Sequence, residues 1–282
     1  MTKMNREEFI KSGLYLHLHT FEKNHPNLEW FVLVIQGSQN YGLDIYTEEY
    51  KSDIDTKMLV IPSLEDIVYN KKPISTTYIL PNNEHTDIKD IRLYFDNFKK
   101  QNINFVEILF SNYYIVNPKY QDLWDELIKN RENIAHYNYN QTLRCIAGMS
   151  MEKKKALCHP YPTIKEKIDK YGYDGKQLHH IIRMNDFIYA YTHNKLYKEC
   201  LTYLPHKELM MEAKLNKFSL EKALELAEFF DNQTKEMKDF YLKEPEEINQ
   251  DALNTLNKVQ YEVIKRKIKT DIIQEEIGKN EK

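Results

Sequence analysis

Two short apolar runs, separated by a long polar stretch, constrain the fold of this chain more than any other feature. The first run is Phe31–Ile35, and the second is Lys57–Ile61, which ends at Pro62. Both are rich in β-branched and large apolar residues and show little alternation, as in strands that are buried on both faces of a sheet. The N-terminal part is therefore expected to contain a sheet, with the polar residues 36–56 connecting two of its strands.

Further strand and helix signals surround this pair. Residues 4–12 predict a short opening helix, and Thr76–Leu80 predicts a third strand. Pro81, Asn82 and Asn83 are typical of a turn that returns the chain as a hairpin into residues 85–88. From Asp90, which is placed to cap a helix, the apolar residues follow helical spacing.

The strand signals stop beyond Asn117-Pro118, and the rest of the chain is predicted to be helical. The expected helices are residues 119–130, 138–156, 174–193, 206–214, 219–241 and 250–270. The fold class is therefore α+β: a domain of residues 1–116 with a mixed sheet and helices, followed by an all-helical domain of residues 117–282.

Glycine content and net charge exclude several classes of function. The chain has only seven glycines and contains neither G-x-G-x-x-G nor G-x-x-x-x-G-K-[ST], which disfavours a dinucleotide-binding fold and a P-loop. Forty basic and 43 acidic side chains give a net charge of −3. The whole chain therefore has no general attraction to nucleic acid or membrane, and any such contact must be local.

The cysteines and the hydropathy pattern favour the cytoplasm. Cys145, Cys158 and Cys200 are widely spaced and form no C-x-x-C pair, which is typical of free thiols in a reducing compartment. No apolar run approaches the roughly 18 residues that a membrane span needs, so no membrane association is expected.

The polar stretch between the first two strands contains two features that suggest phosphate and metal chemistry. Gly37 and Ser38 directly follow the first strand, where backbone N–H groups and a hydroxyl can face an anion. Asp53 and Asp55 alternate with Ile54, so on an extended segment both carboxylates point the same way while Ile54 faces the core. Paired carboxylates suit Mg²⁺. Taken alone, an Asp-x-Asp is also common on solvated surface loops.

The order of strand, Gly-Ser and Asp-x-Asp strand resembles the nucleotidyltransferases of the DNA polymerase beta superfamily. Within it, the chain looks like the RlaP-type nucleotidyltransferases associated with RNA repair. The residues that carry this resemblance, which covers roughly residues 30–190, are Gly37-Ser38 with Tyr41-Gly42, Ser52–Asp55, Asn102–Leu109, and Gly172–Lys176 with His180 and Arg183.

The resemblance implies metal-dependent transfer of a nucleoside monophosphate from a nucleoside triphosphate, with release of pyrophosphate. Gly37 and Ser38 would hold the triphosphate, and Tyr41 could border the nucleotide. Asp53 and Asp55 would bind two Mg²⁺ ions, which Mn²⁺ could replace.

The family also implies a third carboxylate on a later strand. Asp87 lies on the fourth expected strand, whereas Asp90 is better placed as the cap of the following helix. Asp87 is therefore favoured as the residue that completes the metal site and helps to deprotonate the attacking hydroxyl.

A second set of polar residues lies on the helix expected to start near Asp174. Lys176, His179, His180 and Arg183 share one face by their spacing, opposite an apolar face. The set could form a wall over a triphosphate or an RNA phosphate, with Lys176, His180 and Arg183 matching the family, or it could be a solvated basic face. Zinc is not expected, because no third ligand is suitably spaced.

Glu107 interrupts the apolar run Phe105–Leu109. A buried carboxylate is costly unless it is paired, so Glu107 is expected either to form a structural salt bridge or to act near the site.

Two kinds of molecule are candidates for the acceptor hydroxyl, an RNA and a protein. The RNA-repair resemblance favours an RNA end such as that of tRNA, while the lack of general positive charge fits a protein hydroxyl, as in adenylylating toxins of the same superfamily. The third hypothesis is a module that binds a nucleotide without turnover. The presence of Ser38, Asp53 and Asp55 argues against it.

Overall fold

The structure, a computed structural model, describes residues 5–47 and 51–280, with side chains to residue 277. The chain divides into two compact units. Unit 1 comprises the described residues up to Lys99, Asn104–Tyr137 and the chain from Asn249, and unit 2 comprises Lys100–Ile103 and Asn138–Ile248. This division differs from the predicted boundary at residue 116, because residues 117–137 and the last helix of the chain belong to unit 1, and Lys100–Ile103 belong to unit 2.

Unit 1 is built on a five-stranded mixed sheet, which confirms the α+β class. The strands are β1 (Trp30–Gln36), β2 (Asp55–Val60), β3 (Ser75–Ile79), β4 (His85–Asp90) and β5 (Tyr114–Val116). Their order across the sheet is β3-β4-β2-β1-β5, with β2 and β4 parallel and the other neighbours antiparallel. The four predicted strands are present, and the predicted turn joins β3 to β4, with Asn83 at a φ of 65° that asparagine tolerates.

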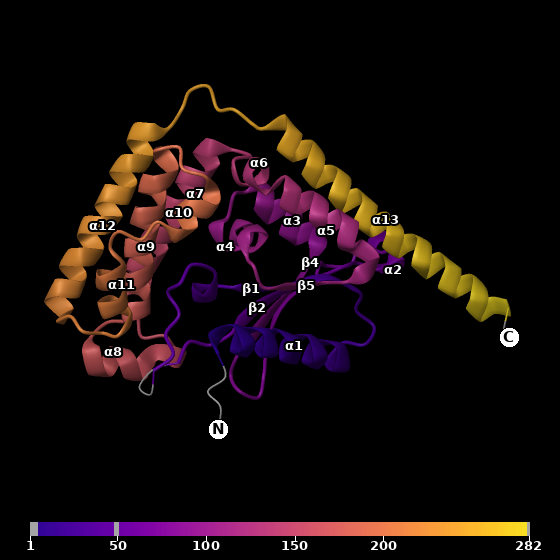
Figure 1. Cartoon of the computed structure of the whole chain (residues 1–282), viewed down its shortest axis with the longest axis horizontal. Helices are drawn as coiled ribbons and strands as arrows, with labels where there is room; N and C mark the ends of the chain where they lie inside the picture. The colour runs from indigo at the N-terminus through magenta and orange to yellow at the C-terminus, as the bar shows by residue number, and fades with distance from the viewer. Residues whose placement is uncertain (1–4, 48–50, 281–282) are drawn as a thin grey trace. The chain divides into compact units, whose positions relative to one another are not determined.

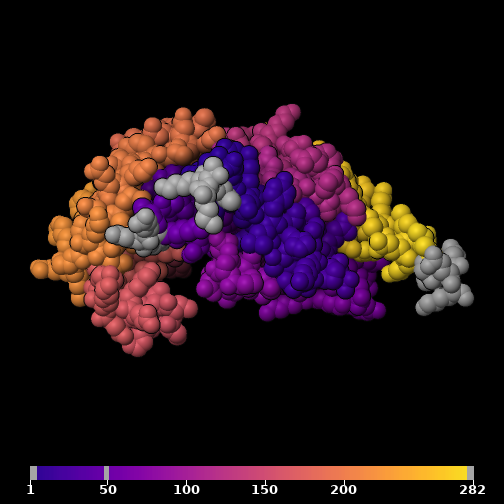
Figure 2. Space-filling model, turned by 60° about the horizontal axis from the view of Figure 1, so that its bottom comes forward, coloured from indigo at the N-terminus to yellow at the C-terminus, as the bar shows by residue number. Residues whose placement is uncertain are grey.

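Helix α1 (Arg6–Asn24) covers one face of the sheet (Figure 1). Asn5 caps its start through a capping box with Glu8. The helix is longer than the predicted residues 4–12, and Gly13 lies in its interior, where the backbone packs closely on the side chain of Ile54. Its apolar face joins the strand residues in one core cluster, which includes Ile10, Leu14, Phe21, Leu33, Ile35, Ile54, Met58, Val60 and Ile88. Figure 2 shows the opposite, solvent-exposed face of α1 in indigo.

The other face of the sheet lies against α3 (Ile91–Lys99) and α5 (Gln121–Lys129) (Figure 1). The Phe31 ring of β1 contacts Tyr120 and Trp124 edge-on here. The shorter helices of this part of the chain are α2 (Leu64–Val68), α4 (Ile103–Val106) and α6 (Arg131–Ala135).

Helix α13 (Gln250–Asn280) completes unit 1 and runs beyond the predicted end at residue 270. Ala252, Leu256, Val259 and Val263 are fully buried at helical spacing. The helix packs against α2, α3, α5 and α6 (Figure 1), so its apolar stripe belongs to the core of unit 1.

Unit 2 is helical. Its elements are α7 (Tyr139–Ala156), α8 (Lys165–Tyr171), α9 (Gly175–Thr192), α10 (Tyr197–Thr202), α11 (Lys207–Lys214) and α12 (Leu220–Tyr241). Helix α9 is its centre and packs against α7, α10, α11 and α12. Asp174 caps α9. At Gly175 the α9 backbone approaches α11 so closely that a Cβ would meet the carbonyl oxygen of Ala213 at 1.9 Å.

Within the described residues, none of the helices has both the length and the apolar character to cross a membrane.

Candidate functional site

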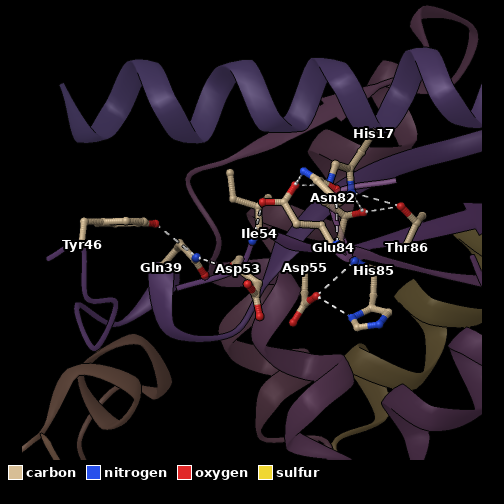
Figure 3. Close-up of polar contacts among 11 residues, drawn as sticks. His17, Gln39, Tyr46, Asp53, Ile54, Asp55, Asn82, Glu84, His85 and Thr86 are labelled. Atoms are coloured by element: carbon tan, nitrogen blue, oxygen red, sulfur yellow. Dashed lines mark hydrogen bonds and ion pairs between the residues drawn. The ribbon is translucent and has the colours of Figure 1, made fainter. Parts of the chain in front are cut away.

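The polar residues singled out from the sequence in unit 1 lie at one end of the sheet. Strand β1 ends at Gln36, which pairs with Asp55 at the start of antiparallel β2. Gly37 and Ser38 therefore follow β1 at the sheet end where the segment 53–55 leads into β2. The Gln39 side chain ties the two segments together, since its Nε2 donates to the backbone oxygen of Asp53 at 2.6 Å (Figure 3).

The loop after β1 begins with a backbone conformation that favours glycine. Gly37 has φ 89° and ψ −152°, and Ser38–Asn40 then form a short 3₁₀ turn rather than the start of a long helix. Two groups hold this loop. The Glu107 carboxylate accepts a hydrogen bond from the Gly37 N–H at 3.3 Å, and the Arg6 guanidinium donates to the Gln39 carbonyl at 3.0 Å.

Asp53 and Asp55 extend on the side of the segment away from α1, while Ile54 extends toward the helix (Figure 3). Ile54 is fully buried, Asp53 is exposed and Asp55 is half-exposed. The alternation that the sequence predicts for these three residues is therefore present, and two carboxylates lie side by side along one face of an extended segment.

His85 is the residue of β4 that contacts Asp55, and sequence reasoning did not select it. Its backbone N–H and its Nδ1 each lie 3.3 Å from Asp55 Oδ1 (Figure 3). Only the parallel register of β2 and β4 brings the two residues together, so a local sequence pattern gives no signal for this pair.

Asp87 lies on the same face of the sheet as Asp55, two positions along β4 from His85. Its carboxylate pairs with Lys57 at 3.0 Å and with Lys89 at 3.1 Å. Lys57 is itself buried, with its ammonium 4.5 Å from the centre of the Phe105 ring. Asp87 is thus a charge-balanced carboxylate in this structure, and its role as the third metal carboxylate stays a prediction.

Asp90 lies on the opposite face of β4 from Asp87, by the alternation of side chains along a strand. It is buried, accepts from the backbone N–H of Arg92 at 2.8 Å and pairs with the Arg92 guanidinium at 2.7 Å. Asp90 therefore caps the start of α3, as predicted.

Two further predicted residues of unit 1 are buried. Glu107 is almost fully buried, and its bond to the Gly37 N–H places it beside the candidate phosphate loop. Which of its two predicted roles it has stays a prediction. Tyr41 is also buried, with 6% of its surface exposed, so most of its ring packs inside the protein. Its predicted place beside a nucleotide stays a prediction.

Lys176, His179, His180 and Arg183 lie on α9 in unit 2, and they do not form a solvated face. Lys176 is exposed and His180 is half-exposed, but His179 and Arg183 are buried. Burial lowers the pKa of His179 to about 3, and its Nδ1 donates to the Met210 carbonyl at 3.1 Å. Although part of His180 is exposed, desolvation by the protein around its ring lowers its pKa as well, and the neighbouring positive charges add to this.

Both histidines are therefore neutral near pH 7. The predicted cationic stripe reduces to Lys176 and Arg183, and only Lys176 of these is exposed.

A buried polar network on the α1 side of segment 53–55 was also missed. His17 of α1 and Glu84, just before β4, are buried and hydrogen-bonded, with Nε2 and Oε2 3.1 Å apart (Figure 3). Burial would raise the pKa of Glu84, but hydrogen bonds from His17, Asn82 and the Ile54 N–H together lower it. Glu84 is thus an ionised carboxylate in the fold. A local pattern cannot find this pair, because 67 positions separate its members.

The donor chemistry at the sheet end fits a hard divalent cation. Asp53 and Asp55 offer carboxylate oxygens, the ligands that Mg²⁺ prefers, and both have solvent access. Across residues 5–47 and 51–280, no three His, Cys, Asp or Glu side chains already stand together as a metal-binding cluster. The pair would therefore leave several positions around a cation to water or to substrate phosphates, as is usual for Mg²⁺.

No family model and no curated protein matches the chain. A nucleotidyltransferase-like protein of solved structure from Exiguobacterium sibiricum is similar to 90% of this chain over 79% of its own, with 12% sequence identity and a TM-score of 0.31. A similarity this distant carries no argument about function.

Proposed function

We propose that the sheet end of unit 1 is the site of a metal-dependent nucleotidyltransferase, which transfers a nucleoside monophosphate from a nucleoside triphosphate to an acceptor hydroxyl. The observation that carries this proposal is the convergence of Gly37-Ser38 with the Asp53 and Asp55 carboxylates at one end of the sheet. The ordered motifs that resemble the RlaP-type nucleotidyltransferases support the same reading.

In this proposal Asp53 and Asp55 hold Mg²⁺, and Asp87 is the third carboxylate. Bound Mg²⁺ would offset the negative charge of the triphosphate and of the departing pyrophosphate. Asp87 would accept the proton of the acceptor hydroxyl. For this, one of the two lysine ammonium groups that contact its carboxylate must be replaced by the hydroxyl. Lys57 and Lys89 would meanwhile hold the Asp87 side chain on the correct face of β4.

The loop after β1 would hold the triphosphate. The Gly37 N–H is already bonded to Glu107, so in this proposal the Ser38 hydroxyl donates to a phosphate oxygen in its place. The reaction then forms a bond between the acceptor oxygen and the α-phosphorus and breaks the bond to the bridging oxygen, so that pyrophosphate leaves. Positioning and charge stabilisation account for this chemistry without a covalent protein intermediate.

That Lys176, His180 and Arg183 of α9 bind the nucleotide stays a prediction from the resemblance. On α9 itself, a neutral His180 can act as a hydrogen-bonding group rather than as a cation, and Lys176 is the exposed charge of the three. Tyr41 would support the loop from within the core, because little of its ring is exposed.

The acceptor is proposed to be an RNA end, such as that of tRNA. Besides the resemblance to RNA-repair enzymes, unit 2 has a cavity of about 470 Å³ between α7 and α12. Four basic residues and one acidic residue line it: Arg144, Lys154, Lys235, Lys238 and Asp231. Of the basic residues, Arg144, Lys154 and Lys238 form ion pairs. Basic side chains around a groove are suited to a phosphate backbone. A protein hydroxyl is the alternative, which the net charge of −3 favours.

The experiment is to incubate the protein and Mg²⁺ with each labelled nucleoside triphosphate, together with total RNA and total protein. Label should move to RNA with release of pyrophosphate, and Asp53→Asn and Asp55→Asn should each lower turnover far more than they weaken substrate binding. Asp122→Asn is the matched control, since Asp122 is an exposed carboxylate of α5 paired with Arg266.

Three outcomes separate the alternatives. Label on protein would identify the protein acceptor, and binding of nucleotide without release of pyrophosphate would identify a module without turnover. Full transfer by the Asp53→Asn/Asp55→Asn double variant would contradict the proposed site.

A further inference from the structure

The peptide unit that joins Asp53 to Ile54 is held at both of its ends by side chains. Its carbonyl oxygen accepts from Gln39 Nε2 at 2.6 Å, and its N–H donates to Glu84 Oε1 at 3.2 Å (Figure 3). Because this peptide is one of the two that link Asp53 to Asp55, its orientation constrains ψ of Asp53 and φ of Ile54, and with them the direction of the Asp53 side chain relative to that of Asp55.

Glu84 is in turn held by two further groups. Its Oε2 accepts from His17 Nε2 at 3.1 Å and from Asn82 Nδ2 at 2.8 Å. His17 Nδ1 lies 2.9 Å from the Thr56 hydroxyl and 3.0 Å from the Thr86 hydroxyl, which fixes the imidazole between β2 and β4. An ionised carboxylate only accepts hydrogen bonds, so His17 Nε2 carries the proton that faces Glu84.

This polar network lies in an otherwise apolar part of the core. Around it, α1 and the sheet contribute Ile10, Leu14, Phe21, Met58 and Ile88. A buried carboxylate and imidazole are costly there, and apolar residues of similar volume often pack as well or better. The network makes a bond that apolar residues could not make, namely the one to the Ile54 N–H.

We propose that Glu84, held by His17 and Asn82, is a positioning residue that orients the Asp53 and Asp55 carboxylates for a shared divalent cation. This inference rests on the proposed function. Glu84 acts through the backbone of Ile54 and lies on the α1 side of the segment, opposite the two carboxylates, so it does not itself bind the metal.

The test is Mn²⁺ affinity, measured from the electron paramagnetic resonance signal of free Mn²⁺ without any substrate. Glu84→Ala should weaken Mn²⁺ binding about tenfold to a hundredfold, as loss of an orienting partner does at metal sites. Glu84→Gln keeps an oxygen for the Ile54 N–H, but its NH2 group then faces the donors of His17 and Asn82, which must turn over or change tautomer. Glu84→Gln should therefore bind Mn²⁺ more tightly than Glu84→Ala. Asn82→Ala, a change at an exposed residue, should give an intermediate loss.

Glu29→Ala is the matched control. Glu29 directly precedes β1, at its other end, and its half-buried carboxylate accepts from the Tyr120 hydroxyl at 2.7 Å. Its loss should lower the melting temperature but leave Mn²⁺ affinity unchanged. All variants are measured well below their melting temperatures.

The outcomes separate this inference from the proposed function. If wild type binds Mn²⁺, Asp53→Asn abolishes binding, and Glu84→Ala and Asn82→Ala bind like wild type, the positioning role is wrong and the metal site stands. If wild type binds no Mn²⁺, or Asp53→Asn and Asp55→Asn leave the affinity unchanged, both proposals are wrong. If Glu84→Ala does not fold, Asn82→Ala and Glu84→Gln decide the question.

Discussion

The Glu107 carboxylate lies 3.3 Å from the backbone nitrogen of Gly37, so a buried acid anchors the first residue of the loop that follows β1. Glu107 comes from a segment 70 positions further along the chain. The loop therefore does not depend on its own sequence alone for its conformation, and the positive-φ backbone that glycine permits at position 37 is held by a long-range contact.

Gly37→Ala should lower the free energy of unfolding by about 1–3 kcal/mol, the usual cost of a backbone held in a sparsely populated region. A Cβ at Gly37 would meet no atom within 4 Å, so the cost comes from φ 89° and not from a clash. Gly148→Ala is the control, because Gly148 lies within α7 and its Cβ would also meet nothing. Gly148→Ala should raise the free energy of unfolding, measured by urea unfolding, by up to about 1 kcal/mol. Equal effects of the two changes would mean that φ 89° adds no cost for an alanine at position 37.

Gly13→Ala should destabilise unit 1 although alanine is the better helix former. Its Cβ would lie 2.3 Å from Ile54 Cδ1, which must move within a packed core at a cost of about 1–3 kcal/mol. Shortening the neighbour in the double variant Gly13→Ala/Ile54→Val should recover most of the loss in thermal melts. No recovery would mean that Ile54 is not the group that limits the space.

Asp87→Asn should lower turnover about a hundredfold if Asp87 is the third carboxylate. The change also leaves the buried Lys57 ammonium without its carboxylate partner, so Asp87→Asn/Lys57→Met separates the two effects. We expect stability but not turnover to return in the double variant. Recovered turnover would show that Asp87 serves only to balance the lysine. Asp90→Asn, which keeps an oxygen to cap α3 but loses the charge paired with Arg92, should lose stability and keep turnover.

The protein should lose stability as the pH falls below about 6.5. His179 has an ordinary pKa of 6.5 that burial lowers to about 3 in the fold. Between pH 6.5 and about pH 3, His179 therefore binds a proton in the unfolded chain but not in the folded chain. The free energy of unfolding is highest above pH 6.5 and falls as the pH is lowered toward 3. In His179→Asn the amide can replace Nδ1 as donor to Met210, so urea unfolding at pH 7.5 and 5 should show a smaller pH effect. An unchanged pH dependence would exclude His179 as its source.

Unit 1 should fold without unit 2. The backbone N–H of Asn249 donates to the Tyr137 carbonyl at 2.8 Å, so the chain leaves and re-enters unit 1 at adjacent positions. A variant in which a short glycine linker replaces residues 138–248 should unfold cooperatively in circular dichroism melts. A fragment of residues 1–116 should not, since it lacks the buried α13 residues Leu256 and Val259. A molten shortened chain would contradict the division into units.

Elements whose signals are local could be predicted from the sequence. The buried runs of β1 and β2 and the turn at Pro81–Asn83 are each encoded within a few residues, as is the alternation of Asp53, Ile54 and Asp55. Strand β5 was missed because three residues are too few to show the alternation of a strand. Its hydrogen-bonded pairing with β1, which the local sequence does not show, defines it as a strand. The end of α1 was misplaced at Gly13 because packing on Ile54 outweighs the helix propensity of glycine.

Features that depend on distant partners could not be predicted. The apolar stripe of α13 predicts a packed helix but does not say which unit it packs on. His85 meets Asp55, and His17 meets Glu84, only through strand register and the docking of α1. The basic residues of α9 illustrate the opposite error, because their spacing suggested an exposed face while α9 is the buried centre of unit 2.

The return of α13 to unit 1 has a consequence for the order in which the protein forms during translation. Leu256, Val259 and Val263 are synthesised after the whole of unit 2, yet they fill the core around α3 and α5. While the ribosome is still adding residues 138–248, the helical unit can fold but the apolar surface that α13 will cover stays open. Unit 1 thus begins to be synthesised before unit 2 but can complete its core only after it. Until α13 has been synthesised, a chaperone would have an apolar surface of unit 1 to bind.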